Sequence, residues 1–145
     1  MMSTSDILRS RKWMLTFQTK HLEDGWTHDA IKAALEPRKL QYWAMCDEIG
    51  GETEKAHTHL IIYRKSPVRA STLRDMFPSV HMEPLKGTMA EARNYLLKSG
   101  KYADTDKAET SVEGTFEEQG ELPEEKGQGA RSDLELMMDM VKEGY

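Results

Sequence analysis

The order of strand and helix signals along this chain constrains its fold more than any other feature. Apolar runs rich in β-branched and aromatic residues predict strands, and capping residues followed by helical spacing predict helices. The predicted strands are residues 11–18, 40–47, 56–63 and 79–83, and the predicted helices are residues 27–35, 71–76 and 88–99. The resulting order is β-α-β-β-α-β-α.

This order indicates an α+β fold. The adjacent second and third strands are suited to a hairpin, and a helix follows the first strand and the third. The pattern is that of a split β-α-β unit, the ferredoxin-like or RRM-like architecture, in which an antiparallel sheet carries helices on one side. The open face of such a sheet commonly binds single-stranded nucleic acid.

The charge of the chain is divided unequally between two regions. Residues 1–107 contain 17 Lys and Arg against 14 Asp and Glu, whereas residues 108–145 contain 3 against 11. A chain of 145 residues with 38% hydrophobic content has room for one compact domain and an appendage. We therefore expect a mildly basic domain over residues 1–107 and an acidic linker, rich in Gly and Glu, over residues 108–131.

A short amphipathic helix is predicted for residues 132–145. Ser132 and Glu135 form a capping box at its start. Its apolar stripe has the spacing i, i+3, i+4 and i+7 and consists of Leu134, Met137, Met138 and Val141. Three roles stay open for this helix: docking onto the domain, self-association, or the start of a following domain.

Cysteine content and hydropathy limit where the protein works. Cys46 is the only cysteine, which excludes an internal disulfide framework or a multi-cysteine zinc site and fits a reducing compartment. No apolar run approaches the roughly 20 residues that span a bilayer, and residues 1–9 lack the apolar stretch of a signal peptide. We expect an intracellular protein without a membrane partner.

Two histidines on the third predicted strand form a candidate metal site. His57 and His59 are two residues apart, so in a strand their imidazoles project from one face and can converge on one ion. The alternative is a pair of surface or half-buried imidazoles. A carboxylate on the preceding strand can supply a third ligand, and alternation allows only one of Asp47 and Glu48 to face the site.

The helix predicted at residues 88–99 carries a candidate nucleophile. Tyr95 and Lys98 share a helical face, so the lysine can reach what the phenol oxygen reaches. The alternative is a core-facing tyrosine with a solvated lysine. A second same-face pair, His81 and Glu83, lies on the fourth strand, where two polar residues on a partly open face are expected rather than another metal site.

These residues, in this order, resemble the endonuclease domain of the replication initiator (Rep) of circovirus-like circular single-stranded DNA viruses, within the rolling-circle HUH nuclease superfamily. The three family motifs correspond to Leu15-Thr16-Phe17-Gln18, His57-Thr58-His59 and Tyr95-Leu96-Leu97-Lys98. The resemblance covers roughly residues 11–135. The residue between the histidines is usually hydrophobic in this family and is Thr58 here. The sequence contains no G-x-x-x-x-G-K-[ST] motif, so the helicase function of the viral relatives is not carried over.

The resemblance implies an HUH endonuclease fold over residues 1–107 and a DNA replication function. Such an enzyme nicks single-stranded DNA at an origin stem-loop by tyrosine transesterification, leaves a 5′-phosphotyrosine and a free 3′-hydroxyl, and rejoins strands in rolling-circle replication. Tyr95 and Lys98 would be catalytic, and Glu48, favoured over Asp47, would join the two histidines in binding Mn²⁺ or Mg²⁺. The compartment would be the host nucleus for a viral protein and the cytoplasm for one from a bacterial plasmid.

Substrate binding is expected to use cations for the phosphates and an exposed aromatic residue for base stacking. The candidates are Arg11, Lys12, Tyr63, Arg64, Lys65, Arg69 and Lys86. Three other functions are compatible with the same residues: a non-catalytic nucleic-acid-binding module of the same fold, a metal-dependent hydrolase that uses water, and an interaction module that acts through its Met-rich C-terminal helix.

Overall fold

A computed structural model describes residues 8–50, 55–97, 110–112 and 114–125. The strands are β1 Arg9–Phe17, β2 Tyr42–Gly50, β3 Lys55–Arg69, β4 His81–Pro84, β5 Thr110–Ser111 and β6 Glu117–Gly120. The helices are α2 Thr19–Glu23, α3 His28–Leu35, α4 Ala70–Met76 and α5 Met89–Leu97, with a short 3₁₀ helix, η1, at Glu36–Arg38. The predicted α+β class is confirmed.

Within the described residues, the strands form one antiparallel sheet. Its order is β4-β1-β3-β2-β5, and β6 also pairs with β2. Because β1 and β2 are both antiparallel to β3, which lies between them, β1 and β2 run in the same direction. The register places His59 between Thr16 of β1 and Cys46 of β2, and it places His57 opposite Glu48 of β2.

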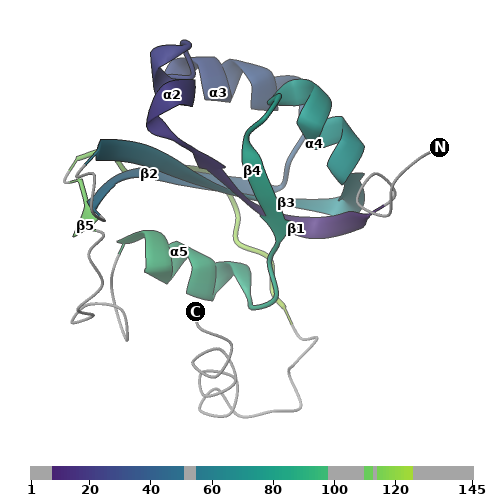
Figure 1. Ribbon diagram of the computed structural model, residues 1–145. Helices are drawn as coiled ribbons and strands as arrows, with labels where there is room; N and C mark the ends of the chain where they lie inside the picture. The colour runs from purple at the N-terminus through teal and green to yellow at the C-terminus, as the bar shows by residue number, and fades with distance from the viewer. Residues whose placement is uncertain (1–7, 51–54, 98–109, 113, 126–145) are drawn as a thin grey trace.

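Helices cover both faces of the sheet. Figure 1 shows α2, α3 and α4 above the sheet and α5 below it. Buried Met89, Ala92 and Leu96 of α5 pack in one cluster with Ala44 and Ile61 of the sheet. The expectation of helices on one side is therefore wrong. Since α5 has its own apolar residues, it covers part of the face that was expected to be open.

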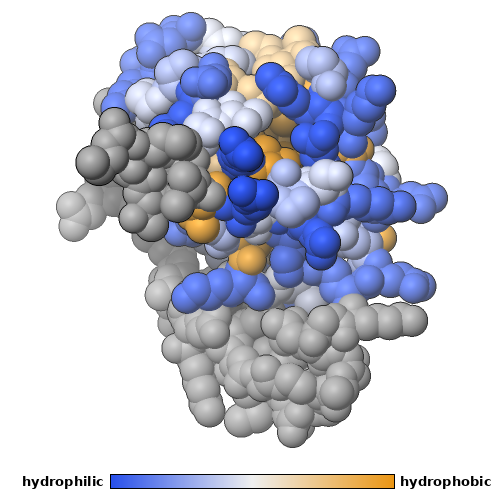
Figure 2. Space-filling view, turned by 90° about the vertical axis from the view of Figure 1, so that its right-hand side faces the viewer, coloured by the Kyte–Doolittle hydropathy of each residue, from blue (hydrophilic) through white to orange (hydrophobic). Residues whose placement is uncertain are grey.

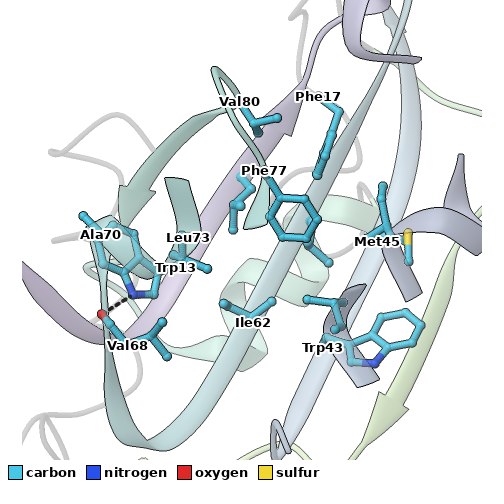
Figure 3. Packing of buried hydrophobic residues seen from close by; sticks show 14 residues of the cluster. Trp13, Phe17, Trp43, Met45, Ile62, Val68, Ala70, Leu73, Phe77 and Val80 are labelled. Carbon is cyan, nitrogen blue, oxygen red and sulfur yellow. Dashed lines mark hydrogen bonds between the residues drawn. The ribbon is translucent and has the colours of Figure 1, made fainter. Parts of the chain in front are cut away.

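The larger core lies on the other face, beneath α3 and α4. Figure 3 shows Trp13, Phe17, Ile62 and Phe77 among the buried side chains that fill it. The Phe17 and Phe77 rings meet edge to face with centroids 5.2 Å apart. The indole of Trp13 donates a hydrogen bond of 3.1 Å to the carbonyl of Val68, which satisfies its buried N–H.

The helix α2 was not predicted, because its five residues lack an apolar pattern. Its first turn is fixed by a capping box in which His21 Nδ1 accepts the backbone N–H of Gln18 at 2.9 Å. The other ring nitrogen of His21 lies 3.0 Å from the Ser79 hydroxyl. His21 is 3% exposed and is a buried structural residue.

The acidic segment expected to be a linker differs from that expectation where the structure describes it. Residues 110–111 and 117–120 form β5 and β6 on the outer edge of β2. These short strands contain few aliphatic residues, and backbone hydrogen bonds and ion pairs hold β6 in place. After β6, residues 121–125, yellow-green in Figure 1, lead toward the first turn of α5. There the backbone N–H of Met89 donates a hydrogen bond to the Glu125 carboxylate.

The described surface is mainly polar. Figure 2 shows hydrophilic side chains over most of one face, with apolar surface limited to small patches between them. Of the residues that the structure describes, the exposed large hydrophobic ones are Leu8, Ile49 and Leu122. Among the described residues, no helix has the length and apolar character needed to cross a membrane.

Replacement of Gly120 at the end of β6 should destabilise the fold. Gly120 has φ +94°, and a Cβ there would overlap the carbonyl oxygen of Gln41. Gly114 also has a positive φ, +83°, but has open space around it. We expect Gly114→Ala to cost about 1 kcal/mol from backbone strain alone and Gly120→Ala to cost about 2 kcal/mol or more. Urea unfolding of both variants checks this, and equal losses would contradict the overlap.

Candidate metal centre

Three candidate ligands converge where β2 and β3 pair. Glu48 Oε1 lies 3.3 Å from His59 Nε2 and 3.7 Å from His57 Nε2. Ligand atoms from all three residues lie within 4.8 Å of one another. Donors bound about 2.1 Å from one ion are separated by roughly 3 to 3.5 Å, so a small adjustment brings this set to coordination distance. The structure thus brings together the three residues expected to bind metal.

The site lies at the boundary between core and solvent. The Glu48 side chain is fully buried, and those of His57 and His59 are 11% and 12% exposed. The two imidazole rings meet nearly edge to face, with centroids 4.9 Å apart. A buried carboxylate requires compensating partners, and one carboxylate with two imidazoles is a donor set that binds divalent metal ions in proteins. The chemistry of these residues fits a divalent cation.

Strand alternation decides between the two adjacent carboxylates of β2. Asp47 points to the opposite face from Glu48, where its Oδ1 accepts a 2.6 Å hydrogen bond from the Thr58 hydroxyl and contacts His28 Nε2 at 2.7 Å. Thr58 therefore faces away from the histidine side, as expected from its position between His57 and His59. Geometry places Glu48, and not Asp47, at the candidate metal centre.

A threonine of β1 supports one of the histidines. Thr16 Oγ1 lies 3.1 Å from His59 Nδ1, and Thr16 is 8% exposed. This contact leaves His59 Nε2 directed toward Glu48. An engaged second nitrogen fixes the ring orientation and tautomer of a metal-binding histidine. Thr16, from the first motif of the sequence, is thus part of the site.

Tyr95 lies beside the candidate ligands. Its ring centroid is 6.2 Å from that of His59, with the rings tilted by 59°. Both residues line a cleft of about 380 Å³ between α5 and the sheet, together with His81, Glu83 and Lys86. His81 and Glu83 are exposed, and His81 Nε2 lies 3.8 Å from Glu83 Oε2. Lys98, the expected catalytic cation, lies outside the described residues.

The predicted DNA-binding residues are not all close together. Lys86 lines the cleft that contains Tyr95, whereas Tyr63, Arg64 and Lys65 line a separate groove at the other end of β3. Lys12 forms an ion pair of 2.7 Å with Glu125. The other two predicted contacts, Arg11 and Arg69, are exposed on β1 and β3. The structure therefore brings one predicted cation, Lys86, next to the site and distributes the others along the sheet.

A polar network on the opposite face was missed because sequence reasoning assigned no role to His28. Its Nε2 lies 2.7 Å from Asp47 and its Nδ1 lies 2.6 Å from Glu117 of β6. The hydrogen bond to Asp47 raises the pKa of His28 above 6.5, burial lowers it, and Glu117 raises it further. Burial raises the pKa of Asp47, but bonds from His28 and Thr58 outweigh this and leave that pKa low. No sequence spacing links these residues, which come from the four elements α3, β2, β3 and β6.

Substitution of Glu48 should weaken metal binding more than substitution of Asp47. Glu48→Gln removes the negative charge from the ligand set, so we expect the Mn²⁺ dissociation constant to rise by at least about tenfold. Asp47→Asn should instead lower stability through His28 and Thr58. Isothermal titration calorimetry with Mn²⁺ and urea unfolding separate these effects. Equal changes in metal affinity would contradict the assignment of Glu48.

The His28 network should make stability depend on pH. Because the pKa of folded His28 is raised, its contribution is complete below pH 6.5 and is lost as pH rises through the folded pKa. The lowered pKa values of Asp47 and Glu117 mean that their contributions are lost at acidic pH. We expect His28→Gln to reduce the free energy of unfolding more at pH 6 than at pH 9. Exposed His81→Gln is the control, and a reduction of equal size at both pH values would exclude a charged His28.

The chain matches no protein-family model and no curated protein sequence. The function is inferred from the geometry of Glu48, His57, His59 and Tyr95 and from the resemblance of their motifs.

Proposed function

We propose that this chain is a metal-dependent endonuclease and strand transferase that nicks single-stranded DNA through Tyr95 and rejoins it. In this proposal it is the nuclease domain of a rolling-circle replication initiator with an HUH fold. The main support for this proposal is that Glu48, His57 and His59 converge beside Tyr95 at one cleft. A donor set for a divalent cation next to a nucleophilic side chain is a combination that can catalyse phosphodiester transesterification.

The reaction exchanges one phosphodiester bond for another. The Tyr95 oxygen attacks phosphorus, the bond from phosphorus to the 3′ oxygen breaks, and the phenol proton is lost while the departing oxygen becomes a 3′-hydroxyl. The products are a 5′-phosphotyrosine and a 3′ end that can prime synthesis. Attack by a 3′-hydroxyl on the phosphotyrosine reverses the exchange and joins strands. A cation held by Glu48, His57 and His59 supplies Lewis acidity toward the phosphate.

The chain's own residues would prepare this reaction in three ways. Thr16 orients His59, and the buried carboxylate of Glu48 provides the charge that a divalent cation requires. The cleft exposes Tyr95 between the sheet and Lys86, whose ammonium can bind a phosphate of the strand. Lys98 keeps its proposed role in stabilising the forming phenolate, because it follows Tyr95 by one helical turn in the sequence.

The strand arrangement supports the finer fold assignment. β3 lies between β1 and β2, which run in the same direction, and β4 lies outside β1. This is the arrangement expected for a split β-α-β, ferredoxin-like domain. The proposed HUH nuclease fold adds a histidine pair on the central strand and a tyrosine helix over the same face, and both features are present.

A non-catalytic nucleic-acid-binding module has less support. Such modules stack bases on an open sheet face, and here α5 covers part of the face opposite α3 and α4. Tyr63, the predicted stacking residue, is half-buried and packs against the cluster beneath α5. A function as such a module would also leave the buried carboxylate of Glu48, which lies close to two histidines, without a role.

Tyr95→Phe should eliminate covalent attachment and nicking but preserve DNA binding. The change removes one oxygen, and we expect the nicking rate to fall by more than about 10³-fold. The substrate is a single-stranded library with a randomised loop on a stem, incubated with Mn²⁺ and separated on a denaturing gel. A 3′ label follows the covalent adduct and a 5′ label follows the nicked product.

The matched control for this test is Tyr63→Phe, which removes the corresponding oxygen from a tyrosine of β3 but keeps the ring that was predicted to stack on a base. This variant should form the adduct at the wild-type rate. Cleavage by Tyr95→Phe without an adduct would indicate hydrolysis by water. An adduct mapped to another tyrosine by mass spectrometry would refute the proposed nucleophile.

A further inference from the structure

The helix that carries Tyr95 packs on the sheet through a narrow apolar face. The α5 helix has nine residues, and its buried side chains are Met89, Ala92 and Leu96. One of the three is an alanine, which adds little buried area. Helices of this length are marginal in isolation and take their stability from tertiary contacts. Polar contacts outside this apolar face also contribute to the orientation of the helix.

The first such contact joins α5 to the acidic strand β6. Arg93 Nε donates to Glu118 Oε1 at 2.7 Å and Arg93 Nη2 donates to Glu118 Oε2 at 2.8 Å, which is a two-pronged pair. The Tyr42 hydroxyl of β2 also donates to Glu118 Oε1, at 2.6 Å. The Arg93 guanidinium lies over the ring of Phe116, 5.4 Å from its centroid. One carboxylate thus joins α5, β2 and β6.

The second contact holds the first turn of the same helix. Glu125 Oε2 accepts the backbone N–H of Met89 at 2.5 Å, and Glu125 Oε1 lies 2.7 Å from Lys12 Nζ of β1. A carboxylate at the N-terminus of a helix accepts a hydrogen bond from a free N–H group and interacts favourably with the positive end of the helix dipole. Met89 and Arg93 are one turn apart, so the two contacts together restrain both translation along the helix axis and rotation about it.

We propose that residues 116–125, through Glu118 and Glu125, position α5 so that Tyr95 faces the metal centre, and that this acidic segment is therefore part of the nicking unit. The inference rests on the proposed function. Glu118 and Glu125 are positioning residues, since they act on the reaction through the helix. Tyr95 extends away from the helix axis, so a small rotation of α5 displaces its oxygen. A displacement of about 1 Å in a reacting group can cost about 100-fold in rate.

The first part of the test changes the two residues of the ion pair between α5 and β6. Glu118→Gln removes the ion pair, and Arg93→Lys keeps the positive charge but cannot form the two-pronged pair. Both variants should reduce the single-turnover rate of adduct formation at saturating DNA by about tenfold or more. Glu121→Gln makes the same change of charge at an exposed position of the same segment and should leave that rate unchanged. All variants are made in the full chain.

Two further measurements distinguish positioning from general stability. The Mn²⁺ dissociation constant should stay within about twofold in every variant, because the ligands are on β2 and β3. Hydrogen exchange of the α5 amides should accelerate in Glu118→Gln but not in Glu121→Gln, with exchange in β1 and β3 unchanged. A parallel loss of metal affinity, or unchanged exchange in α5, would overturn the inference.

The outcomes for the two proposals are separable. If the wild-type chain forms no adduct, the proposed function fails, and hydrogen exchange still decides whether Glu118 holds the helix. If the wild type forms an adduct and Glu118→Gln forms it at the rate of Glu121→Gln, the positioning role fails while the nuclease proposal stands. Rescue of the rate by Glu118→Asp, which retains the carboxylate, would further support positioning.

Discussion

The alternation of side chains along β3 is the constraint on which the rest of this structure depends. This strand is paired on both sides, so its backbone is fixed and each residue has one face available. Leu60 and Ile62 face the larger core, while His57, His59 and Ile61 face the side covered by α5. A one-residue shift in register would exchange these sets, burying imidazoles in the core and exposing leucine and isoleucine. The candidate metal centre and the hydrophobic core are therefore specified by the same pairing.

Much of the fold could be predicted from the sequence, because strands and helices are marked by signals in their own residues. Apolar runs marked β1, β2 and β3, and α3 begins at His28, within one residue of the predicted start. The face shared by His57 and His59 follows from period two alone. The choice between Asp47 and Glu48 could not be made from spacing, because either residue can face the histidines until the register of β2 is known.

The remaining features depend on contacts between residues distant in sequence. β6 has the sequence EEQG, which lacks strand propensity, and it is held by pairing with β2 and by ion pairs to α3 and α5. The role of His28 depends on Asp47 and Glu117, which lie 19 and 89 residues away. The acidic composition of this segment correctly indicates solvent exposure. Here it also reflects carboxylates that form ion pairs with basic side chains of the folded domain. Arg93 holds the pKa of Glu118 at about 2, so this carboxylate is ionised throughout the neutral range.

The pairing of β5 and β6 with β2 also bears on how the sheet behaves in a crowded solution. An uncovered strand edge offers unsatisfied N–H and C=O groups to any passing chain and favours aggregation. Among the described residues, β5 and β6 occupy the outer side of β2, and the opposite margin is β4, which has four residues and ends at Pro84. A short margin that ends in proline is a poor template for another strand. On the other side, the outer edge of the sheet is formed by the short strands β5 and β6, and their length and the negative charge of β6 disfavour pairing with another chain.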